Sequence, residues 1–75
     1  MSARKSQDAA LVKISEAATA AGVSRQTVEY YIMLGMIKPL RLSRKPGRHF
    51  DAALVKRIVL IHRLNESGYT LRDIR

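Results

Sequence analysis

Basic side chains are the groups with the clearest chemistry in this sequence of 75 residues. Residues 38–57 hold seven Lys and Arg side chains and one acidic residue, Asp51, a net charge of +6 within a total of +8. Such a concentrated positive charge favours a polyanionic partner, and nucleic acid is the commonest polyanion in cells. The alternative is a basic surface that only keeps the protein in solution.

A set of polar side chains precedes this basic stretch, at the spacing that places residues on one face of a helix. Arg25 can pair with guanine and Gln26 with adenine, each through two hydrogen bonds. Tyr30 can donate its hydroxyl to a phosphate, although partly exposed packing is an equal alternative. Glu29 repels phosphate, but it can accept from a cytosine amino group or orient Arg25, which lies one helical turn earlier.

Other kinds of site find no support in the sequence. There is no cysteine, and the two histidines lack Cys, Asp or Glu partners at metal-ligand spacing, so we expect no metal. No acid–base pair, activated nucleophile or phosphate-binding glycine loop is present, so we expect neither an enzyme nor a cofactor. No apolar run approaches the roughly 20 residues of a membrane span, and no signal peptide is recognisable. We expect a cytoplasmic, nucleoid-associated protein.

Residues 14–35 contain the secondary structure that would position these side chains. The segment predicts a helix-turn-helix, a unit whose second helix enters the major groove of DNA. Ala18 is small enough to let two short helices cross closely, and Gly22 can adopt the left-handed backbone that ends the first helix. Ser15 is the expected N-cap of the first helix, and Ser24 is that of the second.

The second helix is expected over residues 25–34. Val28, Tyr31 and Ile32 have the i, i+3, i+4 spacing of a buried stripe. The polar residues of this helix then lie on its opposite, outer face. Gly35 is expected to end the helix.

The remaining sequence predicts a wing and a third helix. Residues 40–50 alternate apolar and basic side chains around a Ser-Arg-Lys-Pro-Gly turn, which is typical of a short β-hairpin. Asp51 is the expected N-cap of a long helix over 51–67, and Thr70 is that of a fourth helix beginning over 70–75. The third helix is apolar on more than one stripe, so another helix or a partner must cover it. The fourth helix is too short to stand alone, so we expect a longer native protein.

We expect two parts in this chain. Residues 1–12 have no sustained hydrophobic period and predict a flexible tail. Residues 13–75 predict a single domain with a small core. Its expected fold class is mainly α, a winged helix-turn-helix with a short β-hairpin wing and a long third helix.

Three segments resemble one family of proteins. They are GVSRQTVEYYIMLGMIKP, GRHFD and IHRLNESGYTLRDI, within a region from about Lys13 to Arg75. Their order resembles the N-terminal DNA-binding domain of the MerR family of bacterial transcription regulators. The resemblance implies binding to double-stranded promoter or operator DNA. It also implies a homodimer held by a long C-terminal helix, so the isolated domain is expected to be monomeric and to bind weakly.

The resemblance further implies which residues contact DNA. Carried over position by position, they are Arg25, Gln26, Thr27 and Tyr30 in the second helix and Arg48 in the wing. Charge alone adds Lys38, Arg41, Arg44 and Lys45 to this set.

The sequence departs from the family pattern in three places. The family often has Arg where this chain has Glu29, so one expected DNA contact is lost there. It often has Glu where this chain has Ile32, which we expect to pack inward. The wing lacks an aromatic residue between Gly47 and Arg48 and is one residue shorter.

Two other functions fit the same residues. One is an architectural DNA binder similar to phage excisionases, which share small winged folds. The other is a protein-interaction module that docks a partner through its apolar third helix. An architectural binder would not distinguish promoter from scrambled DNA, and a docking module would bind a protein with little dependence on salt.

Overall fold

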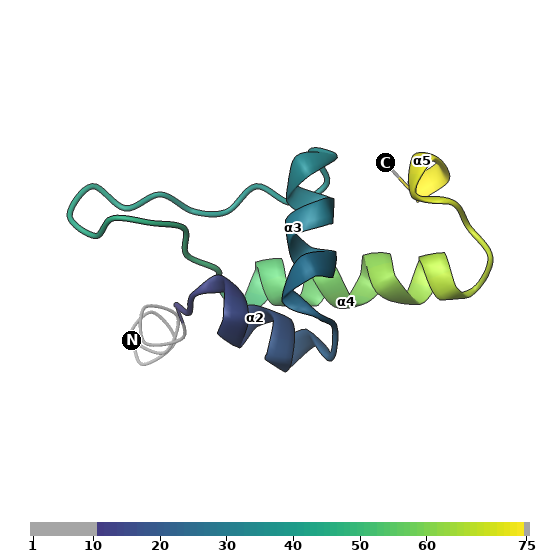
Figure 1. Cartoon of the computed structure of the whole chain (residues 1–75), viewed down its shortest axis with the longest axis horizontal. Coiled ribbons are helices and arrows are strands. Elements are labelled where there is room, and N and C mark those ends of the chain that lie inside the picture. Colours follow the sequence, from purple (N-terminus) through teal and green to yellow (C-terminus); the bar gives the residue numbers. More distant parts are fainter. Residues whose placement is uncertain (1–10, 75) are drawn as a thin grey trace.

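The computed structural model describes residues 11–74, which form four helices. In the labels of Figure 1 they are α2 (Ile14–Ala21), α3 (Arg25–Met33), α4 (Ala52–Glu66) and α5 (Leu71–Ile74). The described part of the chain is mainly helical, and it contains isolated β-bridges but no longer strand. The expected tail lies outside the described residues as far as residue 10.

Helix α2 begins earlier than expected, with Lys13 rather than Ser15 as its N-cap. The reason is Glu16, whose Oε1 accepts a hydrogen bond from the backbone N–H of Lys13 at 3.3 Å. A Glu at the third helical position can reach back in this way and satisfy the amide of the cap. Ser15 instead lies in the first turn, where its carbonyl accepts from the Thr19 hydroxyl.

The turn between α2 and α3 has the predicted geometry. Gly22 has a φ of 75°, the left-handed backbone that glycine adopts without steric cost. The following amide, that of Val23, donates to the carbonyl of Ala18 at 3.0 Å. Ser24 then caps α3, because its Oγ accepts from the backbone N–H of Thr27 at 3.1 Å. Both expectations for Gly22 and Ser24 are confirmed.

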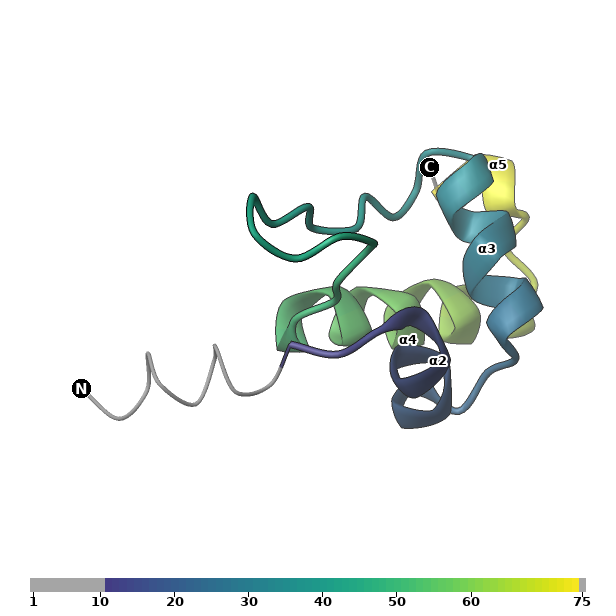
Figure 2. The same ribbon diagram turned by 60° about the vertical axis from the view of Figure 1, so that its left-hand side comes forward.

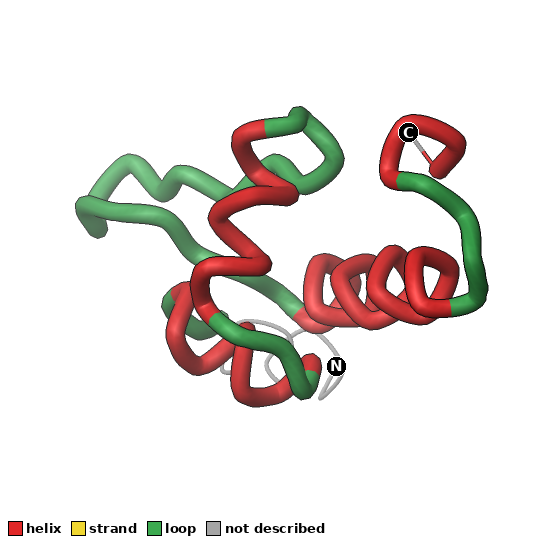
Figure 3. Tube along the Cα trace, turned by 45° about the vertical axis from the view of Figure 1, so that its right-hand side comes forward, coloured by secondary structure: helices red, strands yellow, loops and turns green. Residues whose placement is uncertain are grey.

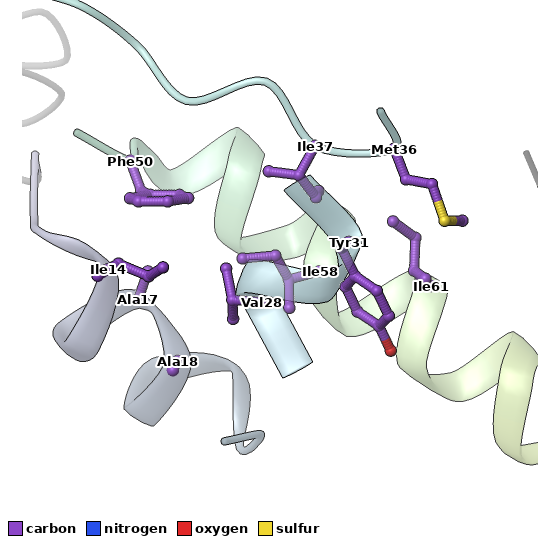
Figure 4. Packing of buried hydrophobic residues seen from close by; sticks show 10 residues of the cluster. All are labelled: Ile14, Ala17, Ala18, Val28, Tyr31, Met36, Ile37, Phe50, Ile58 and Ile61. Carbon is purple, nitrogen blue, oxygen red and sulfur yellow. The ribbon is translucent and has the colours of Figure 1, made fainter. Parts of the chain in front are cut away.

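The core lies where α2, α3 and α4 meet (Figure 4). Ala17 and Ala18 are buried and small, so α3 can approach α2 closely. Ile32, expected in the buried stripe of α3, is only half-buried at the edge of the core. The buried apolar side chains are Ile14, Ala17, Ala18, Val28, Tyr31, Met36, Ile37, Phe50, Ile58 and Ile61.

A long loop leads from α3 to α4. Gly35 ends α3 with a φ of 79°, as predicted, and the next amide, that of Met36, donates to the carbonyl of Tyr31. Nε of Arg57 in α4 donates to the carbonyl of Met36 at 2.8 Å, which holds the start of the loop on the core. Figures 1 and 2 show that the loop then extends away from the helices, at the end of the molecule opposite α5.

Residues 40–50 differ from the hairpin that the sequence predicts. Leu40 and His49 form one antiparallel bridge, with hydrogen bonds of 2.8 and 2.9 Å, and no strand extends from it. The bridge does not continue to the next residue, because Phe50 pairs with Val12 instead, through backbone hydrogen bonds of 2.8 and 2.9 Å. Val12, assigned to the tail from the sequence, is therefore paired with the loop. Pro46, near the tip, has no amide to donate.

Helix α4 begins at the predicted cap, since Oδ1 of Asp51 accepts from the backbone N–H of Leu54 at 2.9 Å. The chain then turns at Gly68 and reaches α5. Thr70 and Asp73 each accept a hydrogen bond from the other's backbone N–H, which caps this single turn. Figure 3 shows α5 folded back beside the end of α4.

The packing of the core predicts that two apolar residues of α4 contribute very differently to the free energy of unfolding. Ile58 is fully buried, so Ile58→Ala is expected to lower the free energy of unfolding by about 2–5 kcal/mol. Leu60, on the same helix, is 56% exposed, and Leu60→Ala is expected to change it by less than about 0.5 kcal/mol. Urea unfolding followed by circular dichroism measures both. Equal effects of the two substitutions would contradict this packing.

Candidate nucleic-acid interface

The outer face of α3 is set by what the helix buries. Val28 and Tyr31 are 0% and 3% exposed, so they define the inward side of the helix. With 3.6 residues per turn, Arg25, Gln26 and Tyr30 must then point outward. Arg25 and Gln26 are exposed, and Tyr30 is 47% exposed. Three of the predicted contact residues thus share one accessible surface.

Thr27 has a more restricted position than the other predicted residues of α3. Its side chain is half-buried, and its hydroxyl lies 2.9 Å from that of Ser24. The backbone N–H of Thr27 also donates to the same serine. Thr27 therefore stabilises the first turn of α3, whatever its hydroxyl contacts outside the protein.

The loop presents the predicted cations, with one exception. Lys38, Arg41, Arg44 and Lys45 are exposed, and none of them forms an ion pair within residues 11–74. Lys13 adds a cation that sequence reasoning did not include, because it lies far from the loop in the chain. Its Nζ is 3.9 Å from the point where a Cβ on Gly47 would stand.

Arg48 is the exception, because it is already bound to Glu29 in α3. Nη1 and Nη2 of Arg48 donate to Oε1 and Oε2 of Glu29 at 2.9 and 2.8 Å. Nε of Arg25 lies 3.8 Å from Oε2 of the same carboxylate, on the helical spacing that suggested this contact. The sequence indicated the Arg25 contact, but it did not indicate the Arg48 pair, whose partners lie on different elements.

The pair keeps both of its charges at neutral pH. The hydrogen bonds from Arg48 hold the pKa of Glu29 below its ordinary value, the charge of Arg25 adds to this, and burial opposes it. The same bonds raise the pKa of Arg48. Because the pKa of Glu29 is lowered, its stabilising effect is present at neutral pH and is lost only as the pH falls through the lowered pKa.

Titratable groups elsewhere do not form a second site. Within residues 11–74, no three His, Cys, Asp or Glu side chains are grouped so as to hold a metal ion. His49 is buried at the base of the loop, and His62 lies 3.4 Å from Glu66 one helical turn away. No helix in this described range is long and apolar enough to cross a membrane.

Comparison with known proteins agrees with this arrangement. The family described as MerR HTH family regulatory protein matches residues 12–75. The chain is 38% identical over 63 residues to the HTH-type transcriptional regulator CueR of Bacillus subtilis (strain 168), covering 84% of this chain and 43% of that protein. It is 36% identical over 62 residues to the mercuric resistance operon regulatory protein of Bacillus cereus, covering 83% of this chain and 47% of that protein.

These matches cover most of the chain, although the chain spans less than half the length of either relative. The family match includes all three segments that resemble the MerR family, and the comparisons confirm the resemblance. With its exposed polar face on α3 and its basic loop, the chain belongs to the MerR family of helix-turn-helix regulatory proteins.

Proposed function

We propose that this chain is the sequence-specific DNA-binding domain of a bacterial transcription regulator. Helix α3 enters the major groove, and the 40–50 loop acts as the wing, along the phosphate backbone or in the minor groove. In this proposal the fold is a winged helix-turn-helix, with α4 as its long third helix. The observation that carries it is the accessible polar face of α3 together with loop cations that have no ion-pair partner among residues 11–74, in a member of a regulator family.

The residue types on α3 suit base readout. Arg25 and Gln26 lie in the first turn, the part of a recognition helix that reaches base edges. Arg pairs bidentately with guanine, and Gln with adenine. The hydroxyl of Tyr30, further along the exposed face, is available to a phosphate.

The loop residues suit phosphate binding. Lys38, Arg41, Arg44 and Lys45 have no ion-pair partner among the described residues, so their charges are available to DNA. Arg48 keeps part of its binding capacity, because a guanidinium has five N–H donors and the pair with Glu29 uses two of them. Arg48 therefore remains in the proposed interface as a contact of fixed position.

The relatives are more than twice as long as the matched region. We propose a homodimer for the full-length protein and a monomer for this domain alone, which then binds DNA weakly with half of the contacts. The proposed partner is promoter or operator DNA in the bacterial cytoplasm, at the nucleoid. No enzymatic role is proposed.

One observation favours a second function. Leu60 on α4 and Tyr69 after it are 56% and 55% exposed, which leaves apolar surface on the third helix and the turn that follows. A protein partner could dock on this surface while α3 and the loop bind DNA. Binding to DNA and binding to protein are separable by their salt dependence.

The test of the main proposal is a titration of the domain with its own upstream promoter DNA and with scrambled DNA of the same composition, over a range of salt concentrations. Tighter, salt-dependent binding to the promoter is expected. Equal binding to both DNAs would favour the architectural function, and no binding to either would favour the protein-docking function.

Arg25→Ala is expected to weaken promoter binding by about 1–3 kcal/mol and to relax the preference at one base pair. The reason is the loss of a bidentate base contact from the first turn of α3. Arg63→Ala, which removes the same charge from an exposed position on α4, is the control. Affinities for a set of single-base variants of the promoter measure the effect. Equal losses on every variant would exclude Arg25 from base readout.

Arg44→Ala is expected to lower the slope of log affinity against log salt by about 0.9, the contribution of one phosphate contact. Its loss should be nearly the same on promoter and scrambled DNA, because a phosphate contact carries no sequence information. Fluorescence anisotropy at several salt concentrations measures the slope. A slope equal to that of the unchanged protein would remove Arg44 from the interface.

A further inference from the structure

We infer that Glu29 is a positioning residue for DNA recognition, whose carboxylate holds the basic loop against α3 through Arg48. This inference rests on the proposed function. It specifies how the two surfaces proposed to contact DNA, the outer face of α3 and the 40–50 loop, are kept in register.

The backbone alone gives the loop little support. Among residues 11–74, the backbone hydrogen bonds of the 40–50 loop lie at its base, in the Leu40–His49 bridge and the pairing of Phe50 with Val12. The tip between these pairs has none. Its position relative to α3 must therefore come from side chains.

Among the described residues, the Glu29–Arg48 pair is the hydrogen-bonded side-chain link between the loop and α3, and it lies directly before the bridged His49. It joins the middle of α3 to the returning arm of the loop by two parallel hydrogen bonds of 2.8 and 2.9 Å. Such fork-to-fork geometry fixes orientation as well as distance. The carboxylate is 39% exposed and the guanidinium 28% exposed, so the pair is partly shielded from water.

The position of Glu29 is unfavourable for DNA binding unless the carboxylate does something else. It lies on the helix that we place in the groove, where a negative charge repels phosphate and offsets one of the cations around it. A carboxylate that only repelled DNA would weaken binding to every sequence. A carboxylate that positions the loop holds the phosphate contacts of the loop in register with the base contacts of α3, and those base contacts form only on the correct site. It therefore strengthens promoter binding. On scrambled DNA α3 has no bases to match and a loose loop still reaches phosphates, so only the repulsion by the carboxylate remains.

The substitution Glu29→Gln separates these two effects by their sign. It removes one negative charge and the ion pair while keeping the size of the side chain. We expect binding to scrambled DNA to stay equal or become tighter, and promoter binding to weaken by roughly fivefold or more, the size of one lost contact of about 1 kcal/mol. Glu66→Gln, which removes the same charge from an exposed position at the end of α4, is the matched control.

If Glu29→Gln instead tightens promoter and scrambled DNA binding by the same factor, the carboxylate is only a repulsive charge, and the inference is overturned. The same holds if Glu29→Gln and Glu66→Gln have equal effects on the ratio of the two affinities.

A second measurement needs no DNA, and so it distinguishes failure of this inference from failure of the proposed function. Backbone ¹⁵N relaxation of the free domain reports the order of residues 41–48. We expect order parameters of about 0.85 in the unchanged protein and below about 0.6 in Glu29→Gln. Loop order that is unaffected by the substitution overturns the inference, whether or not the domain prefers promoter DNA.

The charge-swapped protein, Glu29→Arg with Arg48→Glu, tests whether the pair itself is responsible. Each single substitution places like charges together and should loosen the loop. The double variant restores opposite charges and should return the order parameters towards those of the unchanged protein. A double variant as mobile as the single variants would show that the pair does not hold the loop.

Discussion

The burial of Val28 and Tyr31 determines which side chains of α3 reach the surface. These two side chains join α3 to the buried cluster that α2 and α4 also form, and the small Ala17 and Ala18 let α3 come close to α2. Once one side of a helix is buried, its 3.6-residue period fixes which residues face outward. The packing of the core therefore determines which side chains form the outer face of α3. A loosened core would change the orientation of these side chains or leave it poorly defined.

Features with local causes could be predicted from the sequence. The left-handed glycines at the ends of α2 and α3 and the caps Ser24 and Asp51 depend on residues within one helical turn, and all are where the sequence indicated. The predicted N-cap of α2, Ser15, lies two residues beyond the observed one, Lys13, because Glu16 accepts a hydrogen bond from the backbone N–H of Lys13.

Features with distant causes could not be predicted. The pairing of Phe50 with Val12 replaces the expected strand, and periodicity within 40–50 carries no information about a partner so far upstream. The same is true of Arg48, which had the right type for a phosphate contact but lies beside Glu29. Residue type and family resemblance predict the candidate DNA contacts. Which of these cations are paired within residues 11–74 depends on the three-dimensional structure, because Glu29 and Arg48 lie 19 residues apart.

The bridge between Val12 and Phe50 also has a consequence for folding. It closes most of the domain into a ring, and the entropy of closing such a ring must be lost before its two hydrogen bonds form. The helical hairpin of α2 and α3 needs only local contacts, which form faster. The basic loop is thus completed after the helices during folding. Its tip is mostly exposed and has no backbone hydrogen bond among the described residues, so local opening of the loop requires less free energy than opening of the helices.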